Sequence, residues 1–292
     1  QPMAKSDDDR SYWFDAAPLT EGRSGVTARL RRQGGGGLEA FAHANDLDYD
    51  ASVAGDLPSL LIHTRSVCKD VVATRGEPKV EFGNHGARFS LSSDDLVPSR
   101  QGYIAVRHGR SLPHVLVDYN GVLGAMTPLN VTSAALTFLS EFDEDKHDAD
   151  QSPLAHFRRT GVRLELPTAP GVAAHTATGS ERQASELLSG ETLSVMADLS
   201  RSFSVEMREG WVFAYSHFGD VTTKDPDVWA WVFATASRLL DLSRLWLDAW
   251  PAAAGEYVAA GTDPRAVPFY TDQRIDRPAK LDGALRFLKR SR

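Results

Sequence analysis

Residues 225–250 read DPDVWAWVFATASRLLDLSRLWLDAW and carry the clearest structural signal in this 292-residue chain. Asp225 is a good helix cap, Pro226 suits the first helical position, and Asp227 complements the positive end of the helix dipole. The pattern predicts an amphipathic helix of about 24 residues, long enough to lie across a sheet. We interpret its tryptophans as core or interface residues. The apolar face consists of Trp229, Val232, Phe233, Leu239, Leu240, Leu242 and Leu247.

The residues before this helix predict a β-hairpin. Phe203, Val205 and Met207 alternate with polar residues, as expected for a strand with one buried face. The pair Glu209-Gly210 supplies turn chemistry, and residues 211–215 (WVFAY) return as the second strand. The helix therefore follows directly on an antiparallel strand pair.

The region 79–119 also has the alternating residue pattern of β-strands. Val80 and Phe82 alternate with charged residues, and residues 84–86 (NHG) have turn chemistry. We predict an antiparallel meander of about four strands over this region. Residues 168–180 are rich in Gly, Ala and Thr, and we expect a connector there.

Together these patterns predict an α+β fold, with one or more mainly antiparallel sheets covered by the long C-terminal amphipathic helix. Shorter helices are expected from Leu38 onward and over residues 191–199. The expected organisation is a flexible lead (1–37), an α+β domain (38–250, in one piece or as two related sheet parts with a break near 141–160) and a C-terminal extension with a basic tail (251–292).

Composition and charge exclude several classes of protein. With 42% hydrophobic and 24% charged residues, the chain can bury a core and is not a disordered tail or a disulfide scaffold. A net charge of −7 argues against a nucleic-acid binder with a broad basic face. No apolar stretch reaches the roughly 20 residues of a membrane span, and the N-terminus shows no signal peptide. We expect the single cysteine, Cys68, to be a buried or inert thiol.

The sequence contains one pair of candidate ligand-binding residues. His114 and Asp118 lie in the run LPHVLVD (residues 112–118), where strand geometry points positions 114, 116 and 118 to one face. An imidazole and a carboxylate there could bind a ligand or transfer a proton. In the alternative, Val115 and Val117 face the core while the other face meets water. We assign no catalytic residue, cofactor or metal, because no metal-ligand spacing, hydrolase elbow or phosphate-binding glycine loop is present.

Residues 274–292 form a basic tail. They contain seven Lys or Arg against two Asp, a net charge of +5, so the rest of the chain carries −12. Leu281, Leu285 and Leu288 recur at helical spacing, which predicts a short basic amphipathic helix. Such a helix can lie on anionic lipid or on a partner, or it can dock on the acidic body of the protein. The contact residues would be Lys280, Arg286, Lys289 and Arg290.

Several short motifs follow one another in a recognisable order: residues 41–45 (FAHAN), 80–84 (VEFGN), 112–118 (LPHVLVD), 203–206 (FSVE), 211–215 (WVFAY), 225–226 (DP) and 229–231 (WAW). In this order the chain resembles a family of uncharacterised actinobacterial membrane proteins over about residues 38–250, with a divergent stretch at 120–180. The resemblance implies a soluble α+β region that follows N-terminal membrane helices, and it implies no activity. This sequence shows no such helices, so we expect either that they lie upstream of Gln1 or that the chain is a soluble relative.

These observations favour a non-catalytic binding or interaction domain of a membrane-associated bacterial protein, cytoplasmic and at the inner face of the cell membrane. Its partner would be a protein or a membrane surface, and not nucleic acid. Two alternatives stay open. One is a small-molecule enzyme of the hydrolase type with a strand-borne site at His114 and Asp118. The other is a structural domain of a homo-oligomer with an exposed seam of Trp229, Trp231, Trp246 and Trp250.

Overall fold

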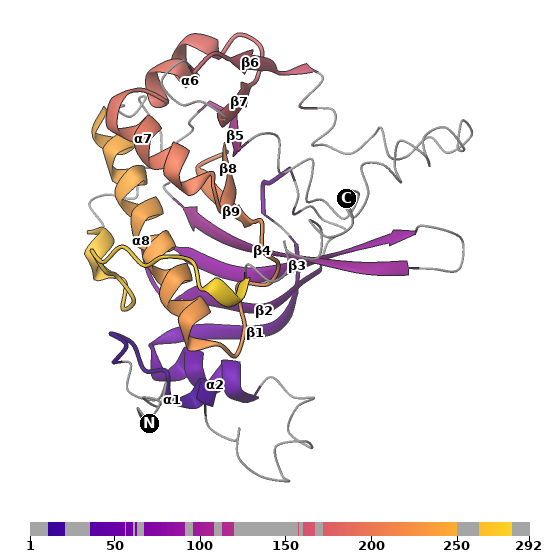
Figure 1. The fold of residues 1–292 in the computed structure, drawn as a ribbon, viewed down its shortest axis with the longest axis vertical. Coiled ribbons are helices and arrows are strands. Elements are labelled where there is room, and N and C mark those ends of the chain that lie inside the picture. The colour runs from indigo at the N-terminus through magenta and orange to yellow at the C-terminus, as the bar shows by residue number, and fades with distance from the viewer. Residues whose placement is uncertain are drawn as a thin grey trace, which may run out of the picture.

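An antiparallel sheet forms the frame of the protein, and it has nine strands in the part of the chain that the computed structural model describes. The described residues are 11–20, 36–55, 57–60, 62, 67–90, 96–107, 113–119, 157, 160–166, 172–249 and 263–281. The strands are β1 (Leu47–Ala54), β2 (Val67–Thr74), β3 (Val80–Ser90), β4 (Leu96–Arg107), β5 (Val115–Tyr119), β6 (Val162–Leu164), β7 (Val172–Thr176), β8 (Phe203–Arg208) and β9 (Trp211–Ser216). Their order across the sheet is β1-β2-β3-β4-β9-β8-β5-β7-β6 (Figure 1).

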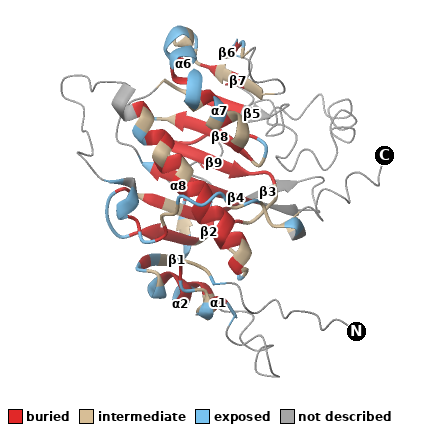
Figure 2. Cartoon of the chain, turned by 60° about the vertical axis from the view of Figure 1, so that its left-hand side comes forward, coloured by how far each residue is buried: buried red, intermediate tan, exposed pale blue. Residues whose placement is uncertain are grey.

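Helices pack against one face of this sheet. They are α1 (Ala17–Thr20), α2 (Gly36–Ala44), α6 (Glu181–Leu187), α7 (Gly190–Leu199) and α8 (Pro226–Ala249), with short 3₁₀ turns η6 (Pro264–Ala266) and η7 (Ala279–Leu281). The long helix α8 runs across the strands, while α2 lies at the β1 end and α6 at the β6 end (Figures 1 and 2). The predicted α+β class, the antiparallel sheet and the long C-terminal helix are confirmed. No helix among the described residues is long and apolar enough to cross a membrane.

Helix α8 begins with the predicted cap. The backbone N–H of Asp227 donates a hydrogen bond to Asp225 Oδ1 at 3.1 Å, and Pro226 is the first helical residue. The cap satisfies one of the backbone donors that a helix leaves open at its start. The local sequence is therefore sufficient to explain where this helix starts.

The tryptophans of α8 are core residues. Trp229, Trp231 and Trp246 are 0%, 4% and 1% exposed and belong to the main hydrophobic cluster between helices and sheet. The interpretation of these three tryptophans as core residues is therefore confirmed, and the alternative of an exposed seam is wrong for them, because their large apolar surfaces are buried within the chain. Trp250 lies outside the described residues.

Phe233 occupies the middle of an aromatic cluster that joins segments far apart in the sequence. Its ring centroid lies 5.1 Å from that of Phe14, 5.5 Å from Phe82, 5.2 Å from Trp229 and 4.7 Å from Phe269. These rings come from the first described segment, strand β3, helix α8 and the segment after α8. One helix residue thus connects the sheet to both ends of the described chain.

Both of these end segments pack on helix α8. Phe14 is 8% exposed and Phe269 is 1% exposed, and Trp13 Nε1 donates a hydrogen bond to the Phe269 carbonyl oxygen at 2.9 Å. Within the predicted lead 1–37, the segment 11–20 therefore packs against the domain. Burial of aromatic rings there compensates for the conformational entropy lost when the segment is ordered.

Strand β3 continues through the residues that we predicted as a turn. Asn84 pairs with Gly102 of β4, and its side chain is 2% exposed. Its Nδ2 donates to the Thr222 carbonyl oxygen at 3.0 Å, and its Oδ1 accepts from the Val221 N–H at 2.9 Å. The amide therefore holds the loop before α8, a long-range use of Asn that local turn propensity does not reveal.

The strands do not form a local meander over 79–119. Strand β4 pairs with β3 and β9, and strand β5 pairs with β7 and β8. Strand β7 itself lies in the stretch that we expected to be a connector. Strands from both sides of the break expected near 141–160 thus belong to one sheet.

We predict that Phe233→Ala lowers the free energy of unfolding by about 3–5 kcal/mol, because it leaves a cavity at the centre of the aromatic cluster. The measurement is urea denaturation followed by circular dichroism. The control is Arg244→Ala at an exposed position of the same helix, where a change within about 0.5 kcal/mol is expected. Equal effects of the two substitutions would contradict the role of Phe233.

Candidate functional site

The sheet face away from the main core carries a buried polar cluster around Glu206. This residue of β8 is 0% exposed. His114 Nε2 lies 2.9 Å from Glu206 Oε1, and the Tyr215 hydroxyl donates to Oε2 at 2.6 Å. The backbone N–H of Leu60 points at both oxygens, at 3.2 and 3.1 Å. Ser59 completes the cluster through a hydrogen bond between its hydroxyl and that of Tyr215.

This geometry gives His114 a carboxylate partner that sequence reasoning missed. Leu116 of β5 is paired with Glu206 of β8, and this register brings His114 near the carboxylate. Asp118 lies farther along β5 and pairs with Ala173 of β7 through the backbone, while its side chain lies outside the described residues. In the sequence Glu206 is one of the polar residues that alternate with Phe203, Val205 and Met207, so no local signal marks it as the partner.

The face that carries His114 is covered. Leu116 is 0% exposed and belongs to a second hydrophobic cluster, whereas Val115 and Val117 belong to the main core. The His114 ring stacks on Phe157 at a centroid distance of 4.0 Å, and 19% of the His114 side chain is exposed. The alternative interpretation of this strand is therefore confirmed for Val115 and Val117, which face the core. It is wrong for the opposite face, which is covered by the second hydrophobic cluster and does not face water.

Glu206 serves as an anchor for the segment around Leu60. Both of its oxygens accept hydrogen bonds from inside the chain, which is how a buried carboxylate avoids an uncompensated desolvation cost. Burial, and then the neighbouring carboxylate of Glu206, raise the pKa of Tyr215 well above its usual value. The phenol therefore stays protonated and keeps donating.

A second buried polar group surrounds Cys68. Tyr103 donates its hydroxyl hydrogen to Glu81, and burial is the main cause that raises the pKa of the Cys68 thiol. A protonated thiol is a poor nucleophile, as expected for an inert cysteine. Gly83 makes room for the Tyr103 ring, because a Cβ at this position would lie 2.6 Å from the phenol oxygen.

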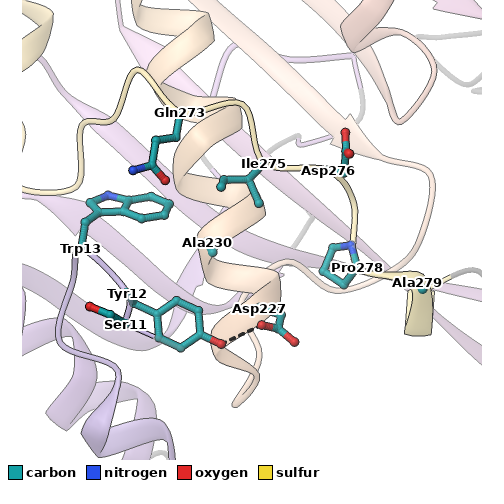
Figure 3. Close-up of a pocket in the computed structure, with 10 residues that line it drawn as sticks. All are labelled: Ser11, Tyr12, Trp13, Asp227, Ala230, Gln273, Ile275, Asp276, Pro278 and Ala279. Atoms are coloured by element: carbon teal, nitrogen blue, oxygen red, sulfur yellow. Dashed lines mark hydrogen bonds between the residues drawn. The ribbon is translucent and has the colours of Figure 1, made fainter. Parts of the chain in front are cut away.

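The helix side of the molecule contains a groove, here called the α8 groove, of about 470 Å³ (Figure 3). It lies between the first described segment, the start of α8 and the segment after η6. Two aromatic side chains form one wall, and the Tyr12 hydroxyl donates to Asp227 Oδ1 at 2.6 Å. The groove is lined by Ser11, Tyr12, Trp13, Asp227, Ala230, Gln273, Ile275, Asp276, Pro278 and Ala279.

The walls of this groove are held in place by long-range contacts. Trp13 is fixed by the Phe269 carbonyl, and the adjacent Phe14 inserts into the aromatic cluster. On the opposite wall, the Thr271 N–H donates to Ser237 Oγ of α8 at 3.1 Å. Sequence reasoning missed the groove because Trp13 is separated by more than 250 residues from its partner Phe269, and only the unusual aromatic run 12–14 hinted at burial.

The tail residues proposed for membrane or partner contact are not placed by the structure. The backbone of Lys280 lies in η7, and its side chain is outside the described part of the chain. Arg286, Lys289 and Arg290 are outside it as well. Among the residues that are described, no group of three or more His, Cys, Asp or Glu side chains could hold a metal ion.

Comparison with known proteins gives one weak structural likeness. No family model matches the chain, and no curated protein matches it. Among solved structures, the chain is similar to the crystal structure of the mycobacterial trehalose monomycolate transport factor A, TtfA, at 11% identity and a TM-score of 0.36. The match covers 74% of this chain and 95% of that chain. The function proposed below therefore rests on the geometry and sequence of this chain.

We predict that Glu206→Gln lowers the free energy of unfolding by about 2–3 kcal/mol, because an amide cannot accept from all three donors. Urea denaturation measures the change. The matched control is Glu209→Gln in the exposed turn of the same hairpin, for which a change within about 0.5 kcal/mol is expected. An increase in stability in Glu206→Gln would contradict an anchoring role and would favour a strained catalytic pair.

Proposed function

We propose that this chain is a non-catalytic binding domain of a membrane-associated bacterial protein and that it binds its ligand in the α8 groove. The observation that carries the proposal is the construction of the groove, in which segments from both ends of the described chain meet over one helix. Its lining offers ring faces, carboxylates and an amide, which are recognition groups. None of the described residues that line it is a Cys, His or Lys.

The negative charge of the groove indicates which ligands it can bind. Asp227 and Asp276 line it, whereas Lys, Arg and His are missing from its described lining. Trp13 and Ile275 add apolar surface to the same groove. We infer that the groove favours an apolar group with a neutral or positively charged end, since a cation gains from both carboxylates and an indole face.

We expect benzylamine to bind in the α8 groove more strongly than benzyl alcohol, because the two probes share a ring and only benzylamine is positively charged. Saturation-transfer difference NMR on the full chain measures the binding. Trp13→Ala is expected to weaken benzylamine binding about fivefold, the size of one cation–π contact.

The matched control for this experiment is Trp211→Ala, which removes a half-buried tryptophan of β9 on the other face of the sheet. This variant is expected to bind benzylamine as the unmodified chain does. Equal binding by the Trp13→Ala variant, or no preference for benzylamine over benzyl alcohol, would count against the groove.

The membrane part of the proposal is supported by the sequence alone. It draws on the resemblance of residues 38–250 to a family of actinobacterial membrane proteins and on the basic tail. Four tail residues near an anionic surface contribute on the order of 1 kcal/mol each. We propose that the chain sits at the cytoplasmic face of the cell membrane and that these residues touch it: Lys280, Arg286, Lys289 and Arg290.

Replacing these four tail residues with Gln should reduce co-sedimentation with phosphatidylglycerol-containing vesicles at least tenfold, because their attraction to the anionic surface is removed. The control is Arg182→Gln, at a position of α6 that is 92% exposed and outside the tail. Vesicle binding that is unchanged by the fourfold substitution would contradict membrane contact by the tail. It would not bear on ligand binding in the α8 groove.

An enzyme with a strand-borne polar site is the second candidate. The contact of His114 with Glu206 favours it, because a buried carboxylate can orient an imidazole for proton transfer. A homo-oligomer stays a third proposal, which the buried tryptophans of α8 do not support. The Glu206→Gln stability measurement separates the first two candidates, since an anchor and a strained catalytic pair give opposite signs.

A further inference from the structure

A second pocket, of about 310 Å³, lies beside the α8 groove and has a different chemistry. It is formed by the end of α7, the middle of α8 and the segment 274–277. Four arginines line it: Arg201, Arg238, Arg274 and Arg277. The remaining lining residues include two carboxylates, Asp198 and Asp276. We call it the arginine pocket.

Asp198 holds two of these arginines in place. Its Oδ2 lies 2.8 Å from Arg238 Nη2, and its Oδ1 lies 2.8 Å from Arg274 Nη2. One carboxylate therefore orients two guanidinium groups from different elements and neutralises only one of them. A guanidinium that is positioned in advance loses less entropy when it binds an anion.

Arg277 is positioned by an aromatic ring. Its guanidinium carbon lies 3.8 Å from the centroid of the Phe218 ring, and Nη1 is 3.5 Å from the Ser202 hydroxyl oxygen. Stacking on a ring fixes the plane of the guanidinium and leaves its charge in place. The arginines of the pocket are thus positioned by two kinds of contact, ion pairs with Asp198 and stacking on the Phe218 ring.

The charge of the arginine pocket is positive although the whole chain is negative. Four arginines oppose two aspartates, while the complete chain carries −7. The nearby His217 adds no charge at pH 7, because burial lowers its pKa to about 4, with a smaller contribution from Arg277. The local excess of positive charge is therefore supplied by guanidinium groups, which remain charged at any physiological pH.

We infer that the arginine pocket binds a phosphate group. Guanidinium groups form paired, charge-assisted hydrogen bonds with phosphate oxygens, and several converge here on one small cavity. The volume is at the lower end of small-molecule pockets and has room for a phosphate with a small organic group. The phosphate belongs either to a soluble phosphate ester or to a lipid headgroup at a membrane surface.

This inference goes beyond the proposed function of the α8 groove. Of the described lining residues, the two cavities share only Ile275 and Asp276, and they differ in charge. Phosphate binding requires neither the Trp13 wall nor the four tail residues proposed to touch the membrane, which are Lys280, Arg286, Lys289 and Arg290. Either proposal can therefore fail while the other one stands.

The experiment titrates the full chain with glycerol 3-phosphate by isothermal calorimetry. The double substitution Arg201→Gln and Arg274→Gln removes two charges from exposed positions, so the fold is retained. We expect it to weaken binding at least tenfold. The control Arg182→Gln removes an exposed arginine outside the pocket and is expected to leave the affinity unchanged.

Vesicles distinguish the two sources of phosphate. Phosphatidylglycerol vesicles are compared with vesicles that contain the same fraction of oleate, which is anionic but carries no phosphate headgroup. A preference for phosphatidylglycerol that the double substitution abolishes, without binding of glycerol 3-phosphate, assigns the pocket to a lipid headgroup. Binding of glycerol 3-phosphate without that preference assigns it to a soluble ester. If both probes bind the double variant as they bind the unmodified chain, or if neither binds the unmodified chain, the inference is overturned.

Discussion

The packing of the α8 aromatic residues against the sheet is the interaction on which the rest of the structure depends. Phe233 and Trp229 contact Phe82 of β3, so they fix the helix across the strands. Phe14 and Phe269 then pack on the same helix residue from opposite ends of the described chain. This cluster therefore helps to hold both segments against α8, where the two cavities lie.

The elements that could be predicted from the sequence are those whose signals are local. Residues 225–250 contain both a helix cap and a sustained apolar periodicity, and the hairpin of β8 and β9 turns at Glu209-Gly210, both with positive φ. The Asn84 region shows the limit of such signals. Its residue types indicate a turn, but hydrogen bonds to a loop more than 130 residues away place it inside a strand.

The candidate sites were harder to predict because each depends on register or on distant segments. The sequence pattern singles out His114 as a candidate, yet its partner Glu206 follows from the pairing of β5 with β8, which no local pattern specifies. The α8 groove depends on Trp13 and on a C-terminal segment that both resembled extensions to the domain. Sequence periodicity identified the helix under the groove but not the walls.

The two faces of the sheet have different proposed roles, ligand binding on the helix-covered face and anchoring of a loop on the other. On one face, cavities of opposite charge lie side by side over α8 and share Ile275 and Asp276. On the other, Glu206 holds the segment around Leu60 by accepting a hydrogen bond from the Leu60 N–H, and it also accepts one from the Tyr215 hydroxyl. Hydrogen–deuterium exchange of the full chain with saturating benzylamine tests this division most directly. We predict slower exchange in peptides covering residues 11–14 and 269–279 and no change over 57–60; slower exchange confined to residues 57–60 and 113–117 would contradict this division.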